Sequence, residues 1–221
     1  MNNIIIFGAS GHAKVVIDIV EKERKYKIAG IVEKINSYEC HDIFGYKILG
    51  TDEDVPTLIS KHSIVGGIVA IGDNFIRKKI VDNLEKLSPD FKFITSIHPS
   101  ANIGRDVIIA DGTVIMAGVT INTCCSIGSH CIVNTNSSLD HDSCMGDFSS
   151  LGPNAVIGGN ARIGSFTVIG IGATLIHGVQ IGEHTVIGAG ATVIRDIGSY
   201  NIAYGTPARI IRERKIGERY L

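Results

Sequence analysis

Residues 163–193 read IGSFTVIGIGATLIHGVQIGEHTVIGAGATV, with an aliphatic residue at every sixth position. The same register runs from Ile103 to Val193 without a break, through sixteen positions that include Met145. Four residues after most of these positions stands a small residue, such as Ala161. A period of six is a signature of the parallel β-helix. We therefore expect three hexapeptides per triangular coil and roughly five coils, with the aliphatic and small residues pointing into the prism.

Glycine directly follows nine of the aliphatic residues, as at Gly104, Gly128, Gly146 and Gly188. We place these glycines at corners of the prism, because glycine accepts backbone angles that other residues resist. Neighbouring coils should hydrogen-bond to one another about 4.8 Å apart, so residues eighteen apart in sequence should stack. The period itself leaves the handedness of the coil open.

The first part of the chain has a different pattern. Residues 4–9 read as a buried parallel strand that runs into the loop at 8–12, and residues 13–25 carry a helical apolar stripe. A second apolar run, residues 28–32, ends at Glu33. This order is that of a nucleotide-binding βαβ unit. The loop is Gly-x-x-Gly, so the dinucleotide fingerprint is not met, and an ordinary α/β turn explains it equally well.

A third apolar strand, residues 68–71, leads into Gly72-Asp73-Asn74 and a helix. We expect the helix to bury Ile76, Ile80 and Leu84 and to expose Arg77 with the two lysines that follow it. The two glycine-containing turns should converge at the carboxyl edge of the sheet, where such sheets bind ligands and helix N-termini favour phosphate. A solvated helix face accounts for the basic residues equally well.

Pro99 and the change of period near residue 100 mark a domain boundary. We expect an α/β domain over residues 1–98, a β-helix over 99–200 and a cap over 201–221 that contains a short helix.

Composition excludes several classes of protein. A net charge of −1 gives no sign of nucleic-acid binding, and the apolar run at residues 4–6 is too short for a signal peptide or a membrane span. The five cysteines lack Cys-x-x-Cys spacing, and Cys125 and Cys131 fall on inward positions of the coil, where they fit as small core residues. We expect a reduced, cytoplasmic protein without membrane association.

The chemistry is expected at His141, which lies two residues after Leu139, at a corner of the prism, between Asp140 and Asp142. A neighbouring carboxylate can fix the tautomer of a histidine and stabilise its cation, as a general base requires. A solvated corner histidine with incidental acidic neighbours is the alternative. His177 lies two coils further along the same corner, roughly 10 Å away at two strand spacings.

A metal site is the other open reading of the histidines. His130 and His184 occupy the neighbouring corner of the prism. A zinc site needs three or four converging ligands, and His141 and His177 are too far apart to share one. A zinc hydratase therefore remains an alternative that metal analysis would test, and no metal is expected.

Four motifs give the chain a family resemblance. They are the Gly-Ala-Ser-Gly-His turn at 8–12, Ile71-Gly72-Asp73-Asn74 with Arg77, the hexapeptides around 134–142, and Gly-Thr-Pro-Ala-Arg at 205–209. Nearly the whole chain resembles the bacterial sialic-acid O-acetyltransferase-like sugar acyltransferases. The resemblance implies a short Rossmann-like α/β domain, a left-handed parallel β-helix and a homotrimer. It implies acetyl transfer from acetyl-CoA to the amino group of a nucleotide-linked 4-amino-4-deoxysugar. O-acetylation of a sugar such as sialic acid, and a non-catalytic nucleotide-sugar-binding trimer, are the alternatives.

The resemblance also assigns roles to single residues. It makes His141 the general base and Asp142 the acid that raises its basicity, with the acetyl-CoA groove between adjacent subunits. Asp142, Lys34 and Ser150 depart from the residues usual in the family, which often has a glutamate, an acid and a histidine at these places. The implied substrate-binding residues are Ser10, Gly11, His12, Glu33, Gly72 and Asn74, and the implied acetyl-CoA-binding residues are Ser150, Gly159, Ile171 and Ala189. Which sugar and which nucleotide bind stays open.

Overall fold

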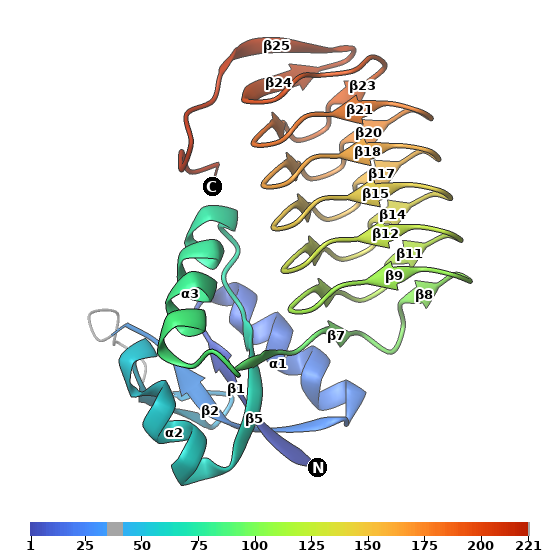
Figure 1. The fold of residues 1–221 in the computed structure, drawn as a ribbon. Coiled ribbons are helices and arrows are strands. Elements are labelled where there is room, and N and C mark those ends of the chain that lie inside the picture. Colours follow the sequence, from blue (N-terminus) through green and yellow to red (C-terminus); the bar gives the residue numbers. More distant parts are fainter. Residues whose placement is uncertain (35–41, 221) are drawn as a thin grey trace. The chain divides into compact units, whose positions relative to one another are not determined.

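The structure, a computed structural model, describes residues 1–34 and 42–220 of the 221-residue chain. The chain divides into two compact units, Met1–Pro99 and Ser100–Leu221 (Figure 1). Residues 35–41, which belong to the expected first domain, and residue 221 of the expected cap lie outside the described residues.

The first unit is built on a sheet with the strand order β3-β4-β2-β1-β5-β6. The central strands are continuous apolar runs because both faces of the sheet are covered, and Ile4, Ile5, Ile6 and Phe7 are fully buried. The predicted strand–turn–helix–strand order is confirmed, although the third predicted strand begins earlier, at Ile64. The elements are β1 (Asn2–Phe7), α1 (Gly11–Glu23), β2 (Tyr26–Val32), β3 (Asp42–Ile43), β4 (Tyr46–Gly50), the 3-10 helix η2 (Asp52–Asp54), α2 (Val55–His62), β5 (Ile64–Val69), α3 (Asn74–Leu87), β6 (Lys92–Phe93) and β7 (Ser96–Ile97).

The two glycine-containing turns converge as predicted. Strand β1 pairs in parallel with β2 on one side and β5 on the other, so the turns after β1 and β5 leave the same edge of the sheet. Gly8 has φ +108, and a Cβ placed on it would lie 2.7 Å from Ile71 Cδ1. The close approach of the two turns therefore requires glycine at position 8.

Arg77 does not lie where the helical pattern placed it. Its side chain is 1% exposed, whereas the pattern predicted an outward position, and Ile76 and Ile80 are only half-buried. Its Nη1 donates to the carbonyl oxygens of Ile71 and Gly72 at 2.7 and 3.0 Å. The carbonyl groups of the turn that precedes α3 thus point inward, and they need a buried hydrogen-bond donor.

The second unit is a parallel β-helix of two-residue strands on three faces (Figure 1). Each strand carries the repeat's aliphatic residue at its second position, and strands eighteen residues apart pair in parallel, as Leu139 pairs with Ile157. The strands are β8 (Asn102–Ile103), β9 (Ile108–Ile109), β10 (Val114–Ile115), β11 (Thr120–Ile121), β12 (Ser126–Ile127), β13 (Ile132–Val133), β14 (Ser138–Leu139), β15 (Cys144–Met145), β16 (Ser150–Leu151), β17 (Val156–Ile157), β18 (Arg162–Ile163), β19 (Val168–Ile169), β20 (Thr174–Leu175), β21 (Gln180–Ile181), β22 (Val186–Ile187) and β23 (Thr192–Val193).

The interior of the prism is as the six-residue period predicted. All aliphatic positions from Ile115 to Val193 are buried, while Ile103 and Ile109 in the first coil are half-buried. The small residues four positions later are buried as well, including Ala161, Cys125 and Cys131.

The corners differ from the prediction. The third residue after each aliphatic position from Ile103 to Ile187 has a positive φ, and most of these residues are not glycine, as at Asp142 with φ +61. The glycines that directly follow the aliphatic residues do not have this conformation. They are required by close packing instead, since a Cβ on Gly146 would lie 2.6 Å from the backbone nitrogen of Ser165 in the next coil.

The prism ends in an antiparallel hairpin of β24 (Asn201–Gly205) and β25 (Ala208–Glu213), so the predicted capping helix is wrong. Strand β24 continues the sheet by pairing with β22, and β25 covers its open edge, which would otherwise expose unpaired backbone groups. Arg214 is buried beyond the hairpin and donates through Nη1 to the carbonyl of His184 at 3.2 Å.

Candidate active site

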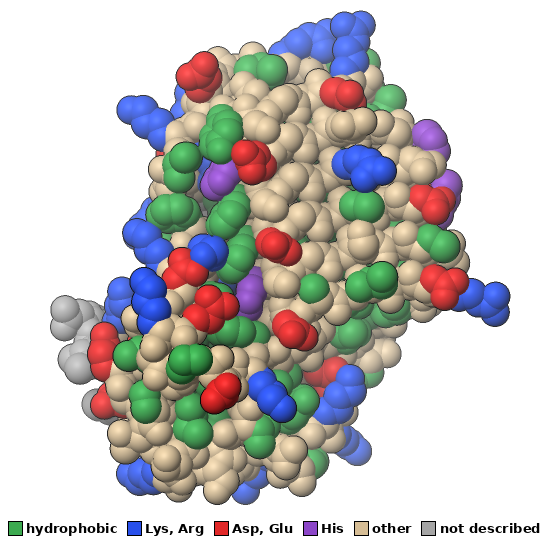
Figure 2. Space-filling view, in the orientation of Figure 1, with side chains coloured by type: hydrophobic (Ala, Val, Ile, Leu, Met, Phe, Trp, Pro, Cys, Tyr) green, Lys and Arg blue, Asp and Glu red, His purple; other side chains and the backbone are tan. Residues whose placement is uncertain are grey.

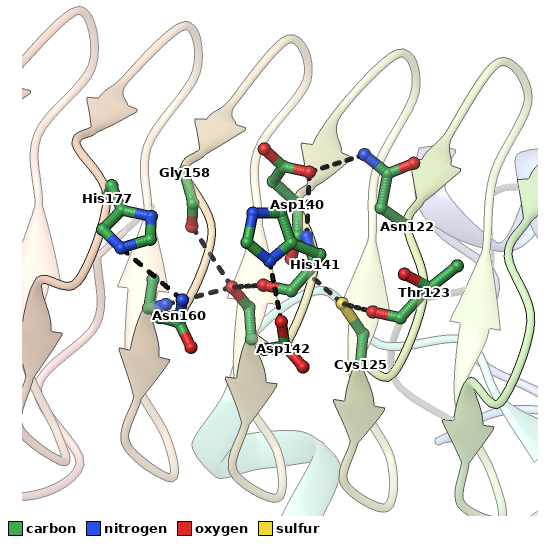
Figure 3. A network of polar contacts seen from close by, with 11 residues as sticks. Asn122, Thr123, Cys125, Asp140, His141, Asp142, Gly158, Asn160 and His177 are labelled. Atoms are coloured by element: carbon green, nitrogen blue, oxygen red, sulfur yellow. Dashed lines mark hydrogen bonds and ion pairs between the residues drawn. The ribbon is translucent and has the colours of Figure 1, made fainter.

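The predicted base sits in the turn between β14 and β15, at one corner of the prism (Figure 3). Nδ1 of His141 lies 2.7 Å from Oδ2 of Asp142, and about half of each side chain is exposed, 45% and 53%. The left-handed backbone of Asp142 is a conformation that Asp accepts better than most residues. Exposed histidine and acidic side chains lie next to one another on one edge of the surface in Figure 2.

The contact with Asp142 sets the chemistry of the imidazole. Its hydrogen bond raises the pKa of His141 above the ordinary value of 6.5, and the negative charges of Asp140 and Asp142 add to the increase against the effect of burial. With Nδ1–H donating to the carboxylate, Nε2 carries the lone pair. The arrangement can therefore accept a proton at Nε2 and stabilise the resulting cation.

Asp140 holds the backbone of the same turn. Its Oδ1 accepts the His141 N–H at 2.8 Å and the Asn122 side-chain amide at 2.6 Å. The hydrogen bond from Asn122 lowers the pKa of Asp140. Sequence reasoning treated Asp140 as a neighbour and missed Asn122, although the eighteen-residue spacing between 122 and 140 places the two on adjacent coils.

Gly159 lies against the ring of His141. It is the residue one coil along from His141, and its buried Cα leaves no room for a side chain, because a Cβ there would lie 2.6 Å from Nε2. The structure thus brings together His141, Asp142 and Gly159, which the resemblance assigned separately to the base and to acetyl-CoA binding.

His177 comes nearer to His141 than expected. The ring centroids are 6.1 Å apart, not the roughly 10 Å given by two strand spacings, because glycine at 159 leaves the space between the two rings open. Asn160 Nδ2 lies 3.5 Å from His177 Nε2. Within residues 1–34 and 42–220 the structure shows no group of three or more His, Cys, Asp or Glu side chains able to hold a metal ion.

His130 and His184 belong to an aromatic column on the neighbouring corner that sequence reasoning missed. Parallel rings stack at centroid distances of 4.9, 5.2, 4.6 and 5.1 Å. The eighteen-residue spacing of the first four rings was the available signal, and Tyr200 follows His184 after sixteen residues. Both histidines pack as members of this stack, and burial lowers the pKa of His184. The members of the column, in order, are His130, Phe148, Phe166, His184 and Tyr200.

A second cluster lies at the carboxyl edge of the sheet in the first unit. Ser10 precedes α1 and Gly11 begins it, and both are exposed. Glu33 follows β2 and accepts the Ala9 N–H through Oε2 at 2.6 Å, so its carboxylate is held against the loop. Ser10 forms no side-chain hydrogen bond to the first turn of α1.

The other three predicted residues of this edge are linked through Arg77. Nη2 of Arg77 donates to Asn74 Oδ1 at 2.7 Å, and Nη1 donates to the Gly72 carbonyl. His12 is half-buried, but its Nε2 atom is buried and has no hydrogen-bond partner in the described part of the chain. Burial, followed by the charge of Arg77, lowers the pKa of His12 to about 4. Asp73 caps α3 by accepting the N–H groups of its first turn.

Comparisons with known proteins agree with this division of the chain. Residues 3–84 match the PglD N-terminal domain, and residues 160–195 match the bacterial transferase hexapeptide repeats. A perosamine N-acetyltransferase mutant from Caulobacter crescentus, solved with CoA and GDP-perosamine, is 34% identical with a TM-score of 0.89, over 96% of this chain and 98% of that one. The chain belongs to this family of hexapeptide-repeat sugar acetyltransferases.

Two further relatives support the assignment. The acetyltransferase domain of PglB from Neisseria gonorrhoeae, solved with acetyl coenzyme A, is 31% identical with a TM-score of 0.86, over 96% of this chain and 100% of that one. A UDP-N-acetylbacillosamine N-acetyltransferase of Bacillus subtilis is 35% identical over 118 residues, 53% of this chain and 52% of that protein. The match thus spans about half the length of that curated relative. The predicted fold class, with a left-handed β-helix, and the acetyl-CoA-dependent acetyltransferase class are confirmed at the level of the family.

The remaining residues assigned to acetyl-CoA do not lie at the His141 corner of this sugar acetyltransferase. Ile171, 59% exposed, and Ala189, also exposed, stack eighteen residues apart on the corner that follows β19 and β22. Ser150 is buried in β16. One chain therefore does not bring these three residues together with His141. In the described part of this acetyltransferase, no helix has the length and apolar character to cross a membrane.

Proposed function

We propose that the protein transfers the acetyl group of acetyl-CoA to the amino group of a nucleotide-linked 4-amino-4-deoxysugar. The observation that carries the proposal is the 2.7 Å contact of His141 Nδ1 with Asp142 on an exposed corner. The relatives support the kind of reaction, since one was solved with CoA and GDP-perosamine and another with acetyl coenzyme A.

In the proposed mechanism the neutral sugar amine attacks the thioester carbonyl carbon. The nitrogen–carbon bond forms as the carbonyl oxygen becomes an oxyanion, and the proton of the amine passes to Nε2 of His141. The oxyanion then collapses back to a carbonyl as the carbon–sulfur bond breaks, and the leaving CoA thiolate takes the proton from the His141 imidazolium, which returns the base to its neutral form. A positioned base contributes about 10²–10⁴-fold to such a step, and the raised pKa of His141 matches its role as acceptor.

Gly159 is the proposed donor to the oxyanion. Its place against the His141 ring, with no side chain, supports this role, because a backbone N–H near the base could reach the carbonyl oxygen under attack. Asp142 is proposed to hold the ring in the reactive tautomer and to stabilise the imidazolium.

The nucleotide sugar is proposed to bind at the carboxyl edge of the first unit, against Ser10, Gly11, His12, Glu33, Gly72 and Asn74. The start of α1 lacks a side-chain cap and is free of acidic residues, whereas Asp73 already occupies the start of α3. A phosphate is therefore better placed at α1. The Nε2 atom of His12 has no hydrogen-bond partner among the described residues, which supports a hydrogen bond to the substrate.

The active enzyme is proposed to be a cytoplasmic homotrimer. Ile171 and Ala189 lie on a different corner from His141, so a groove that uses all of them needs the corner of a neighbouring subunit. Within the described residues no disulfide joins Cys124, Cys125, Cys131 or Cys144, which supports a reducing compartment.

The test is release of CoA thiol from acetyl-CoA with UDP-, GDP-, dTDP- and CMP-linked 4-amino sugars as acceptors. One nucleotide should give turnover and should also raise the melting temperature by mass action. Turnover with sialic acid but with no amine would replace the proposal with O-acetylation. Binding of a nucleotide sugar with no acetylation of any acceptor would favour a non-catalytic trimer.

A further inference from the structure

Asn122 and Asp140 form a side-chain pair across two adjacent coils beneath the His141 turn (Figure 3). The Asn122 amide donates to Asp140 Oδ1 at 2.6 Å, and the same oxygen accepts the backbone N–H of His141 at 2.8 Å. The mechanism above uses neither side chain. The pair nevertheless links the backbone that carries the base to the coil before it.

The rest of Asp140 is held as firmly as its carboxylate. Its N–H donates to the Ile157 carbonyl at 3.0 Å, and its own carbonyl accepts the Cys125 thiol at 3.0 Å. The N–H of Asn122 donates to the Leu139 carbonyl at 2.9 Å. Backbone hydrogen bonds to neighbouring coils fix both residues. The side-chain contact between them therefore fixes the position of the carboxylate that binds the backbone N–H of His141.

Asp140 also contributes charge. The charged and titratable side chains that face His141 in the described structure are Asp140 and Asp142 from its own turn and His177 from the turn after β20. Asp142 touches the ring, whereas Asp140 reaches it only through the backbone N–H and through space. With its pKa lowered by Asn122, Asp140 stays ionised at neutral pH, so its negative charge favours the imidazolium.

We propose that Asn122 and Asp140 are positioning residues for His141, which hold its backbone in place and set a fixed negative charge beside its ring. The kinetic consequence rests on the proposed function, but the effect on the imidazole itself does not. The two variants separate the two contributions. Asp140→Asn keeps an acceptor oxygen of the same shape and removes the charge, whereas Asn122→Ala keeps the charge and removes the donor.

The experiment is an NMR titration of the His141 ring in the full-length protein, together with kcat/KM as a function of pH. Asp140→Asn should lower the pKa of His141 and move the acid limb of kcat/KM to lower pH, because the base then stays neutral to lower pH. Asn122→Ala should lower kcat about three- to tenfold, a fraction of the effect of the base itself, with a smaller change in the pKa and little change in KM.

Asp147→Asn is the matched control. Asp147 Oδ1 accepts the backbone N–H of Ser129 from the preceding coil at 2.8 Å, so it is also a carboxylate bound to backbone, but on a different corner. It should leave the His141 pKa unchanged. Wild-type pKa and kcat in both test variants, or an equal change in the control, would overturn the proposal. If no acceptor is acetylated, the proposed function fails, and the pKa comparison still decides whether Asp140 acts on His141.

Discussion

The imidazole of His141 lies against the backbone of Gly159, so closely that a Cβ at position 159 would come within 2.6 Å of Nε2 and 2.8 Å of Cε1. The three nearest atoms all belong to the ring at the end of the His141 side chain and not to the backbone of the neighbouring coil. Substitution at this position should therefore move the ring and leave the β-helix intact.

Gly159→Ala is expected to displace His141 and reduce kcat at least tenfold, since small shifts of a catalytic group are costly. Thermal unfolding should change little. Gly198→Ala is the control, because a Cβ on Gly198 would meet only the Asn201 amide at 3.7 Å. A wild-type kcat in Gly159→Ala would show that the His141 ring can move without loss of activity.

His141→Asn should leave the fold intact and lower turnover at least about a hundredfold, the range of a lost general base. Near-UV and far-UV circular dichroism should match the wild type, and steady-state thiol release gives the rate. A variant that turns over at the wild-type rate would exclude His141 as the base.

Asp142→Asn should cost less activity than loss of the histidine, and it should change the pH profile. The hydrogen bond to Asp142 is the largest cause of the raised His141 pKa, so its carboxylate keeps the ring protonated to higher pH. Without that charge the pKa falls, and the acid limb of kcat/KM moves to lower pH. If the acid limb of kcat/KM did not move, it would reflect the titration of a group other than His141.

Arg77→Met should destabilise the first unit by about 2–4 kcal/mol, because the carbonyls of Ile71 and Gly72 would lose a buried charged donor. Urea unfolding measures the change. Binding of the nucleotide sugar should weaken as well, since the turn before α3 would relax. Lys86→Met, at an exposed position near the end of the same helix, is the control and should be nearly neutral.

His12 should make the stability of the first unit depend on pH. Its folded-state pKa of about 4 lies below the ordinary value of 6.5, so the unfolded chain binds more protons between these values. Stability should fall as pH drops from about 6.5 to about 4. In His12→Gln this part of the profile should flatten. Equal slopes for the two proteins, measured by urea unfolding at several pH values, would contradict the buried neutral state.

The repeat could be predicted because its signal is periodic and local. Between Ile115 and Val193 one rule was sufficient, namely that every sixth side chain points into the prism. All of these side chains are buried. The place of His141 two residues after Leu139 was sufficient to put it on a corner beside its carboxylate.

Features that depend on the packing of particular atoms could not be predicted. Helical periodicity treats an arginine as an outward residue, and nothing in the sequence shows that the turn before α3 directs two carbonyls inward to Arg77. The 6.1 Å approach of His177 to His141 depends on the missing side chain at Gly159. Likewise, the basic residues of the tail fit a helix as well as the hairpin that completes the last sheet.

The corners of the β-helix all share one backbone conformation, which limits the ways in which such a protein can change in length. Each coil repeats the same conformations over eighteen residues, so inserting or deleting one whole turn of the spiral would move the catalytic machinery along the axis by a single step and keep its stereochemistry. An insertion of one residue would instead turn the inward-facing side chains outward, and the outward-facing ones inward, in the rest of its strand. Evolution of this scaffold is thus free to proceed by duplication and strongly restricted in small indels.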